Sequence, residues 1–196
     1  MSTKEKECDS SIFEDLSLLY EYPKEELIPV ISLLIKKFSK KSNLLFIPII
    51  DKLNTFFDYC SSNPLSKLEE DYIATFEMNT KYVLYVGHKL FGENYERSEF
   101  IAQLKEYYTE NNFIIENNEL PDHIAVILNF LSKDTIPSED KNKLVENLIQ
   151  SFGKETNFQG KVQDTFLTNI DVNNKYPLLY LLLTDLIEIF KIWEID

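Results

Sequence analysis

The amino-acid sequence predicts an all-α fold, in which residues 1–196 form a single-domain bundle of about eight or nine helices. Glycine is scarce, at 4 of 196 residues, and most Ile, Leu and Phe recur at helical rather than alternating spacing. The hydrophobic fraction of 44% is sufficient for one core without disulfides or a structural metal. These observations favour a helical bundle over a β-sandwich or a doubly wound sheet.

The first third of the chain carries the signals of three helices. Ser10 or Ser11 can cap the first helix, which is expected to end near Pro23. The second is expected over about residues 24–39. In the third, "IPIIDKLNTFFDYC", Pro48 marks the start and the following "SSNP" marks the end.

A fourth helix is predicted over "PLSKLEEDYIATFEMN", where Leu65, Leu68, Tyr72 and Phe76 share one face. The next segment, "TKYVLYVGHKLFGENYE", contains β-branched and aromatic residues, two glycines and no 3.6-residue period. We therefore expect an extended or irregular connection there, with about one helical turn.

Five further helices are expected in the second half of the chain. They cover about residues 97–111, the stretch from "ELPDH" to before Pro137, residues 138–152, part of "FQGKVQDTFLTNI", and a last helix from Pro177. The last one, "PLLYLLLTDLIEIFKIW", is shorter than the roughly 20 apolar residues that span a bilayer. Charged residues also interrupt it, so we expect a buried terminal helix.

The chain is strongly acidic, with a formal net charge of -13. Nucleic-acid binding is therefore not expected, because affinity for phosphates depends largely on Lys and Arg. The acidity favours a basic partner, although it can also serve solubility alone. Cys8 and Cys60 form no CxxC motif and suit a reducing compartment. The first residues, "MSTKEKECDSS", lack the apolar region of a secretory signal, so a cytoplasmic location is expected.

Motifs of enzymes are absent from the sequence. It has no HExxH, no GxSxG, no P-loop and no GxGxxG, and its two histidines are His88 and His123. We therefore predict a protein that is not an enzyme. Distant ligands can meet in space, so a metal-dependent hydrolase that uses both histidines with Asp122 and Glu93 stays an alternative.

The stretch "ELPDHIAVI" has the pattern of a helix start. Pro121 suits the first turn, Asp122 can accept hydrogen bonds from free backbone N–H groups, and the positive helix end disfavours protonation of His123. The same three residues can also be part of a surface that holds a partner, and the sequence alone leaves both interpretations open.

The stretch "GHKLFGENYERSEF" has the pattern of a corner between helices. Its glycines permit close backbone approach, Glu93 and Arg97 are spaced for an ion pair, and Phe91 adds apolar bulk. It can be a stiff corner or a lip that clamps a peptide. In "EEDYIATFE", Tyr72 and Phe76 lie beside acidic residues, as core aromatics or as part of a binding face.

The stretches "EEDYIATFE", "GHKLFGENYERSEFIAQLKEYY" and "NNELPDHIAVILNFLS" occur in this order at close spacing. Together they resemble the NarJ branch of the TorD/DmsD/NarJ family of molybdoenzyme maturation chaperones, over a core of residues 68–132. The resemblance implies a TorD/NarJ-like helical bundle. It also implies a partner-binding face, and we add Phe91 of the corner to it. The predicted face then consists of Glu70, Asp71, Tyr72, Phe76, His88, Phe91, Glu93, Arg97, Pro121, Asp122 and His123.

The function implied by the resemblance is that of a cytoplasmic nitrate reductase assembly chaperone. Such a protein binds the N-terminal segment of the catalytic subunit of a respiratory, membrane-bound nitrate reductase and assists insertion of the molybdenum cofactor before membrane docking. No cofactor is expected to stay bound to the chaperone, because the molybdenum cofactor is handled on the client. A chaperone of another molybdoenzyme, such as a sulfoxide, N-oxide or selenate reductase, is the main alternative.

Overall fold

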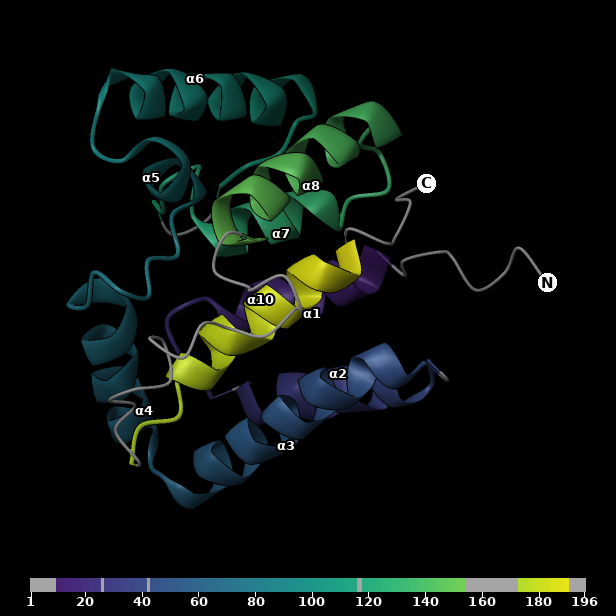
Figure 1. Ribbon diagram of the computed structural model, residues 1–196, viewed down its shortest axis with the longest axis vertical. Coiled ribbons are helices and arrows are strands. Elements are labelled where there is room, and N and C mark those ends of the chain that lie inside the picture. Colours follow the sequence, from purple (N-terminus) through teal and green to yellow (C-terminus); the bar gives the residue numbers. More distant parts are fainter. Residues whose placement is uncertain (1–9, 26, 42, 116–117, 154–172, 191–196) are drawn as a thin grey trace.

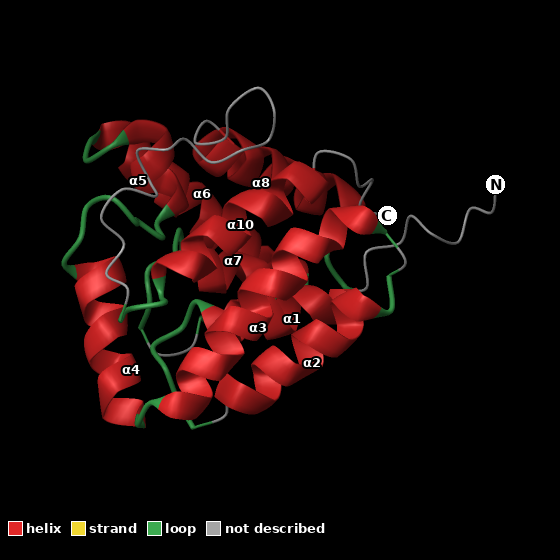
Figure 2. Cartoon of the chain, turned by 60° about the horizontal axis from the view of Figure 1, so that its bottom comes forward, coloured by secondary structure: helices red, strands yellow, loops and turns green. Residues whose placement is uncertain are grey.

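The computed structural model describes residues 10–25, 27–41, 43–115, 118–153 and 173–190. Within these ranges the chain is all-helical and contains no strand, which confirms the predicted fold class (Figure 2). The α-helices are α1 (Ser10–Leu19), α2 (Leu27–Ser39), α3 (Ile47–Ser62), α4 (Leu65–Tyr72), α5 (Val86–Phe91), α6 (Tyr95–Glu110), α7 (Ile124–Leu131), α8 (Ser138–Phe152) and α10 (Pro177–Phe190). The helix expected within "FQGKVQDTFLTNI" lies outside the described residues.

Helix α10 is the centre of the bundle. Of its 14 residues, 11 are buried, and it packs against α3 on one side and α8 on the other. Figure 1 shows α10 crossing the middle of the molecule, with α2 and α3 below it and α6, α7 and α8 above it. A helix that is apolar nearly all round is stable in an interior position, which confirms the buried terminal helix. None of the described helices is long and apolar enough to cross a membrane.

The first three helices follow the predicted pattern, with shifts of a few residues at their ends. Helix α1 packs on α7 and α2, and α2 packs on α3. Helix α2 begins at Leu27 rather than near residue 24, so Pro29 falls in its first turn, where a missing N–H leaves no broken hydrogen bond. Helix α3 has Pro48 at its start, as predicted.

The predicted fourth helix changes its winding before it ends. Helix α4 stops at Tyr72, and a π-helical segment, η3 (Ile73–Glu77), follows without a break. Its closing hydrogen bond runs from the Met78 N–H to the Ile73 carbonyl, at 2.9 Å. The wider turn changes which side chains align at helical spacing, and such segments are frequent at functional sites.

The connection after η3 is irregular up to Tyr85 and then forms the short helix α5. This agrees with the expected irregular segment that contains about one helical turn. The chain pairs there with the residues before α7, because the Val86 N–H donates to the Asp122 carbonyl at 2.8 Å and the Ile124 N–H donates to the Leu84 carbonyl at 2.9 Å. These two bonds bring the glycine-containing corner and the "PDH" motif together.

Candidate functional site: an acid-rimmed groove beside a buried ion pair

The "PDH" motif and the corner are joined by an ion pair. Arg97 Nε donates to Asp122 Oδ2 at 3.0 Å, and the Asp122 side chain is completely buried. Arg97 also bonds Glu93, and its guanidinium lies over the Tyr85 ring, 5.5 Å from the centroid. The pair therefore fixes α6 against the segment that leads into α7.

Glu93 extends this network to the surface. It accepts from His88 Nδ1 at 2.8 Å and from Arg97, which completes a chain of four polar side chains from His88 to Asp122. The hydrogen bond from His88, together with the positive charge of Arg97, lowers the pKa of the Glu93 carboxyl below its usual value. The corner is thus held by its own charges, as the Glu93 and Arg97 spacing predicted.

Gly87 is required by the close packing of this network. A Cβ atom at this position would lie 2.8 Å from Asp122 Oδ2, 2.9 Å from Phe100 Cδ1 and 3.2 Å from Arg97 Cγ. Gly92 serves a different purpose, because its φ of +76° lies in the region that side chains disfavour. Gly87 therefore has the role that the sequence suggested, close approach, and Gly92 is needed for its backbone conformation.

His123 is the cap of α7, and this corrects the expectation that Asp122 accepts from the first turn. Helix α7 begins at Ile124, and the Ala125 N–H donates to His123 Nδ1 at 3.3 Å, so Nδ1 carries no proton. The imidazole is almost wholly buried, and this burial lowers the pKa of His123 below 6.5. The predicted direction is confirmed, with burial as the main cause.

The aromatic residues of α4 and η3 belong to the core. Tyr72 donates from its hydroxyl to the Tyr20 carbonyl at 2.9 Å, and both Tyr72 and Phe76 pack edge-on against Tyr176. Asp71 is also buried, and accepts from the Tyr59 hydroxyl and from Lys67 Nζ. The core interpretation of this motif is therefore the one that the structure supports.

The residues predicted to form one partner-binding face are consequently split between the interior and the surface. The side chains of Asp71, Tyr72, Phe76, Pro121, Asp122 and His123 are buried, whereas Glu70, Phe91 and Glu93 are exposed and His88 and Arg97 are intermediate. Asp122 cannot meet a partner's positive charge directly, because it already neutralises Arg97 within the chain.

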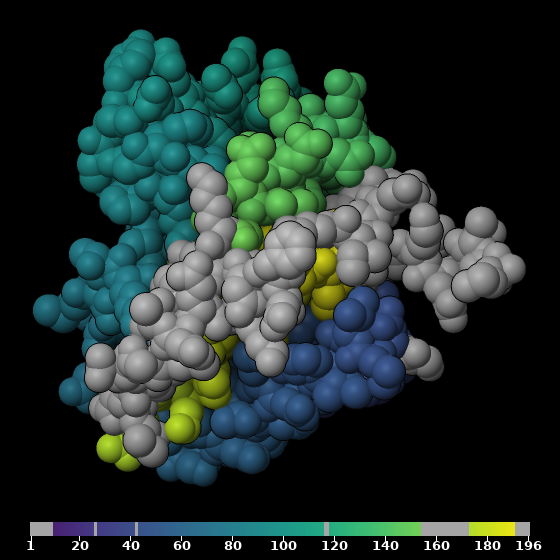
Figure 3. Space-filling view, viewed as in Figure 1, coloured from purple at the N-terminus to yellow at the C-terminus, as the bar shows by residue number. Residues whose placement is uncertain are grey.

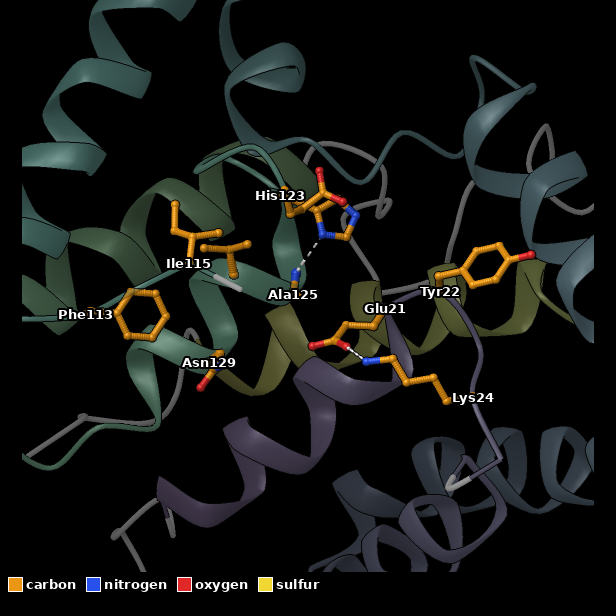
Figure 4. Close-up of a pocket in the computed structure, with 10 residues that line it drawn as sticks. Glu21, Tyr22, Lys24, Phe113, Ile115, His123, Ala125 and Asn129 are labelled. Atoms are coloured by element: carbon orange, nitrogen blue, oxygen red, sulfur yellow. Dashed lines mark hydrogen bonds and ion pairs between the residues drawn. The ribbon is translucent and has the colours of Figure 1, made fainter. Parts of the chain in front are cut away.

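A pocket of about 230 Å³ lies where the α1–α2 connection faces α7 (Figure 4). Its walls are Glu21, Tyr22, Lys24, Phe113, Ile115, Glu119, His123, Ala125, Val126 and Asn129. A second pocket of about 300 Å³ shares three of these residues and continues along α2, lined by Leu18, Glu21, Tyr22, Lys24, Leu27 and Val30. We call the two together the α1–α7 groove.

The α1–α7 groove combines an apolar floor with an acidic rim. Phe113, Ile115 and Val126 supply apolar surface, and charge comes from Glu119 and from Glu21, which Lys24 pairs with at 2.8 Å. Glu119 is held in place because its Oε1 accepts from the Leu120 N–H at 2.8 Å and from the Tyr85 hydroxyl at 3.3 Å. Such a groove suits a ligand that presents an apolar side chain next to a basic one.

Asn129 adds a polar group to the wall of this groove. Its Oδ1 is buried and has no hydrogen-bond partner within the described part of the chain. Buried polar atoms are nearly always hydrogen-bonded in folded proteins. This acceptor is therefore an unusual feature of the groove wall.

Of the residues predicted for the site, His123 is the one that lines the α1–α7 groove. Tyr22 connects the groove to the C-terminal end of α4, since its ring packs edge-on against that of Tyr72, with the ring centroids 5.6 Å apart. The sequence carried one signal for this location. In "NNFIIENNELPDH", apolar residues stand in a loop without helical spacing, and Ile114 and Leu120 are exposed there.

The alternative of a metal-dependent hydrolase finds no support in the arrangement of its four residues. Arg97 bonds both Glu93 and Asp122, which puts a guanidinium where a metal ion would have to lie. The lone pair of His123 Nδ1 is used by the helix cap. Across the described ranges, no three His, Cys, Asp or Glu side chains are grouped so that they could hold a metal ion.

The fold and the site define the chain as a helical protein with a groove in its surface, and comparison with known proteins gives its family. The sequence model of the family described as "Nitrate reductase delta subunit" matches residues 48–166, more than half of the chain. The chain therefore belongs to the nitrate reductase delta subunit family. This confirms the resemblance found in the sequence, and the matched region contains all the predicted site residues.

One curated relative is the "Probable nitrate reductase molybdenum cofactor assembly chaperone NarJ" of Bacillus subtilis (strain 168), which is 32% identical over 121 residues. The alignment covers 60% of this chain and 62% of the relative. A solved structure, described as a putative redox enzyme maturation protein from Archaeoglobus fulgidus, shares 16% identity, with a TM-score of 0.49 over 96% of both chains.

Proposed function

We propose that this protein is an assembly chaperone for a respiratory nitrate reductase. In this proposal it binds the N-terminal segment of the catalytic subunit and keeps that subunit accessible for insertion of the molybdenum cofactor before membrane docking. The family membership, and the description of the Bacillus subtilis relative as a probable nitrate reductase assembly chaperone, support nitrate reductase as the client. The protein acts in the cytoplasm by binding and release, breaks no bond, and handles the cofactor on the client without keeping it.

The observation that carries the binding mode is the α1–α7 groove with its acidic rim. An amphipathic peptide helix can place an apolar side chain against Phe113, Ile115 and Val126. A basic side chain one turn away would then meet Glu21 or Glu119. Lys24 forms an ion pair with Glu21 at 2.8 Å, so a basic side chain of the peptide would compete with Lys24 for the Glu21 carboxylate.

The peptide backbone has a second point of attachment in Asn129. Its Oδ1 has no hydrogen-bond partner among the described residues, so a small rotation of the side chain toward the groove would let it accept from a peptide N–H and would offset the cost of leaving it unsatisfied. The other residues predicted for the partner-binding face have two roles in this proposal. Asp122, Arg97 and Pro121 hold the start of α7, which His123 caps and which leads to Asn129, while the exposed Glu70 and Phe91 supply contacts beyond the groove.

Calorimetric titration with a synthetic peptide of the reductase N-terminus tests the proposal. We expect micromolar or tighter binding that weakens as salt rises, because exposed charges are screened. Glu119→Gln keeps the acceptor that Leu120 and Tyr85 use but removes the charge, and should weaken binding about threefold to tenfold. Glu139→Gln on the exposed face of α8 is the matched control and should leave the affinity unchanged.

A steric variant tests the apolar floor separately. Val126→Phe adds volume where Val126 lines the groove, and should abolish peptide binding. Because Val126 is only 8% exposed, the larger ring should also lower the free energy of unfolding by about 1–3 kcal/mol, so circular dichroism at the titration temperature must show that the variant is folded. The proposal fails if the folded wild-type protein does not bind the nitrate reductase peptide. Tighter binding of a sulfoxide or N-oxide reductase peptide would instead indicate that this other reductase is the client.

A further inference from the structure

Positive charge is concentrated in one segment of this acidic chain. Between Ile28 and Ile50 the sequence has four lysines and no Asp or Glu, although the whole chain has 33 acidic and 20 basic residues. The lysines are Lys36, Lys37, Lys40 and Lys41, at the end of α2 and just beyond it. Lys36 and Lys40 are exposed and are one helical turn apart.

Apolar side chains are exposed directly after these lysines. The relative exposures are 80% for Leu44, 47% for Leu45 and 48% for Ile47, and the adjacent Pro48 is also exposed. Single exposed apolar residues are common, but a contiguous group on a protein surface marks an interaction site. The group lies at the turn between α2 and α3, at the edge of the layer that Figure 3 shows in blue.

The backbone of this turn is held so that these side chains point outward. Asn43 caps the 3-10 helix η2 (Leu44–Phe46), since its Oδ1 accepts from the Leu45 N–H at 3.0 Å. Phe46 is buried against Phe38, with ring centroids 5.4 Å apart, and Ile49 is fully buried. Each pair of exposed residues, at 44–45 and 47–48, is followed by a buried one, so the exposure is part of the folded structure.

Local stabilisation accounts for only part of the positive charge. Lys37 bonds Asp15 at 2.5 Å and the Ser11 carbonyl at 3.0 Å, which ties α2 to α1. Lys36 lies in the last turn of α2, where a cation interacts favourably with the helix dipole. Neither contact accounts for the exposed charge of Lys40 or for the exposed side chains of Leu44 and Leu45.

We propose that the α2–α3 tip, formed by Lys36, Lys40, Leu44, Leu45 and Ile47, docks this protein onto an anionic membrane surface. The three apolar side chains would enter the interface between headgroups and acyl chains, and the lysines would lie among the lipid phosphates. The acidic remainder of the chain is repelled by such a surface, so only an approach with the tip first is favourable.

A second copy of this chain is a less suitable occupant of the tip. A two-fold dimer brings identical surfaces together, and here it would bring one lysine group against the other. An anionic lipid surface instead offers both negative charge and an apolar layer. The α1–α7 groove lies at the other end of α2, about 20 Å away for a helix of this length, so docking and peptide binding can occur together.

Vesicle sedimentation of the full chain tests this inference. Wild-type protein should sediment with vesicles of equal parts phosphatidylcholine and phosphatidylglycerol, and much less with phosphatidylcholine alone. Leu44→Ser combined with Leu45→Ser should lower the partition coefficient about tenfold or more. Lys36→Glu combined with Lys40→Glu should have a similar effect and should remove the preference for anionic lipid.

Control variants carry comparable substitutions at exposed positions elsewhere, Met78→Ser and, with the same change in net charge, Lys105→Glu combined with Lys143→Glu, and should bind vesicles like wild type. The inference is overturned if wild-type protein ignores anionic vesicles, or if the tip variants bind them as well as the controls do. It is equally overturned if the leucine variant abolishes a concentration-dependent dimer without any change in lipid binding. Peptide affinity is measured on the same samples, so failure of the groove is seen separately.

Discussion

Arg97 and Asp122 lie 25 residues apart in the sequence and form an ion pair of 3.0 Å in which the carboxylate is completely buried. The pair joins the first turn of α6 to the segment before α7. Because α7 carries His123, Ala125, Val126 and Asn129 of the α1–α7 groove, the pair fixes one wall of that groove from behind. Its effect on a ligand is therefore indirect.

Replacement of Asp122 should be costly. Asp122→Ala leaves Arg97 without its buried partner, and breaking such a pair from one side typically lowers the free energy of unfolding by about 3–5 kcal/mol. Urea denaturation followed by circular dichroism measures this loss. Glu93→Gln is the matched control, since Glu93 bonds the same guanidinium with a side chain that is 71% exposed, and should change stability by less than about 1 kcal/mol.

Gly87→Ala should destabilise the fold by about 1–3 kcal/mol, because the added methyl would overlap Asp122, Phe100 and Arg97. Thermal unfolding gives the measurement. At Gly92 a methyl group meets nothing within 4 Å, and the cost arises from the positive φ instead. Gly92→Ala and Gly92→Asn should therefore both be costly, because a φ of +76° with a ψ of −160° is a backbone conformation that essentially only glycine adopts, whereas at Gly87 every larger residue should be worse than alanine.

His123 should make stability depend on pH. Its pKa in the folded protein is below 6.5, so at acidic pH the unfolded chain binds a proton that the folded chain does not. The free energy of unfolding should consequently have its full value, as far as His123 is concerned, above about pH 6.5. It should decrease as the pH is lowered from there. Urea titrations between about pH 7.5 and pH 5 test the sign.

His123→Asn separates the titration of His123 from its capping role. Asparagine is a good N-cap, so α7 keeps an acceptor for the Ala125 N–H while the titrating group is removed. The fall in stability below about pH 6.5 should be smaller in this variant than in His88→Asn, which removes the other imidazole. An unchanged pH profile in His123→Asn would show that other groups cause the dependence.

Phe76→Ala tests whether the aromatic residues of "EEDYIATFE", in α4 and η3, belong to the core. Phe76 packs against Tyr72 and Tyr176, and its removal should lower the free energy of unfolding by about 3–5 kcal/mol. Phe91→Ala makes the same change on a half-exposed ring that packs on Phe100, and should cost clearly less. Equal losses in chemical denaturation would contradict the assignment of Phe76 to the interior.

The sequence by itself determined the fold class and most of the helices. Helical spacing of apolar residues, prolines at helix starts and the apolar segment from Pro177 are local signals, and helices form from local hydrogen bonds. The π-helical turn after Tyr72 was not predictable in this way, because the sequence stretch reads as one continuous helix. The order of the three motifs was also sufficient to identify the family, because a family is recognised from the sequence without coordinates.

Only the tertiary structure decided the direction in which each polar and aromatic side chain points. Asp122 was expected to face a partner and instead neutralises Arg97, and Tyr72 and Phe76 lie in the core. The α1–α7 groove joins residues from positions 18 to 129, so no local pattern could indicate it. Burial and pairing depend on contacts between distant segments, and these exist only once the chain has packed.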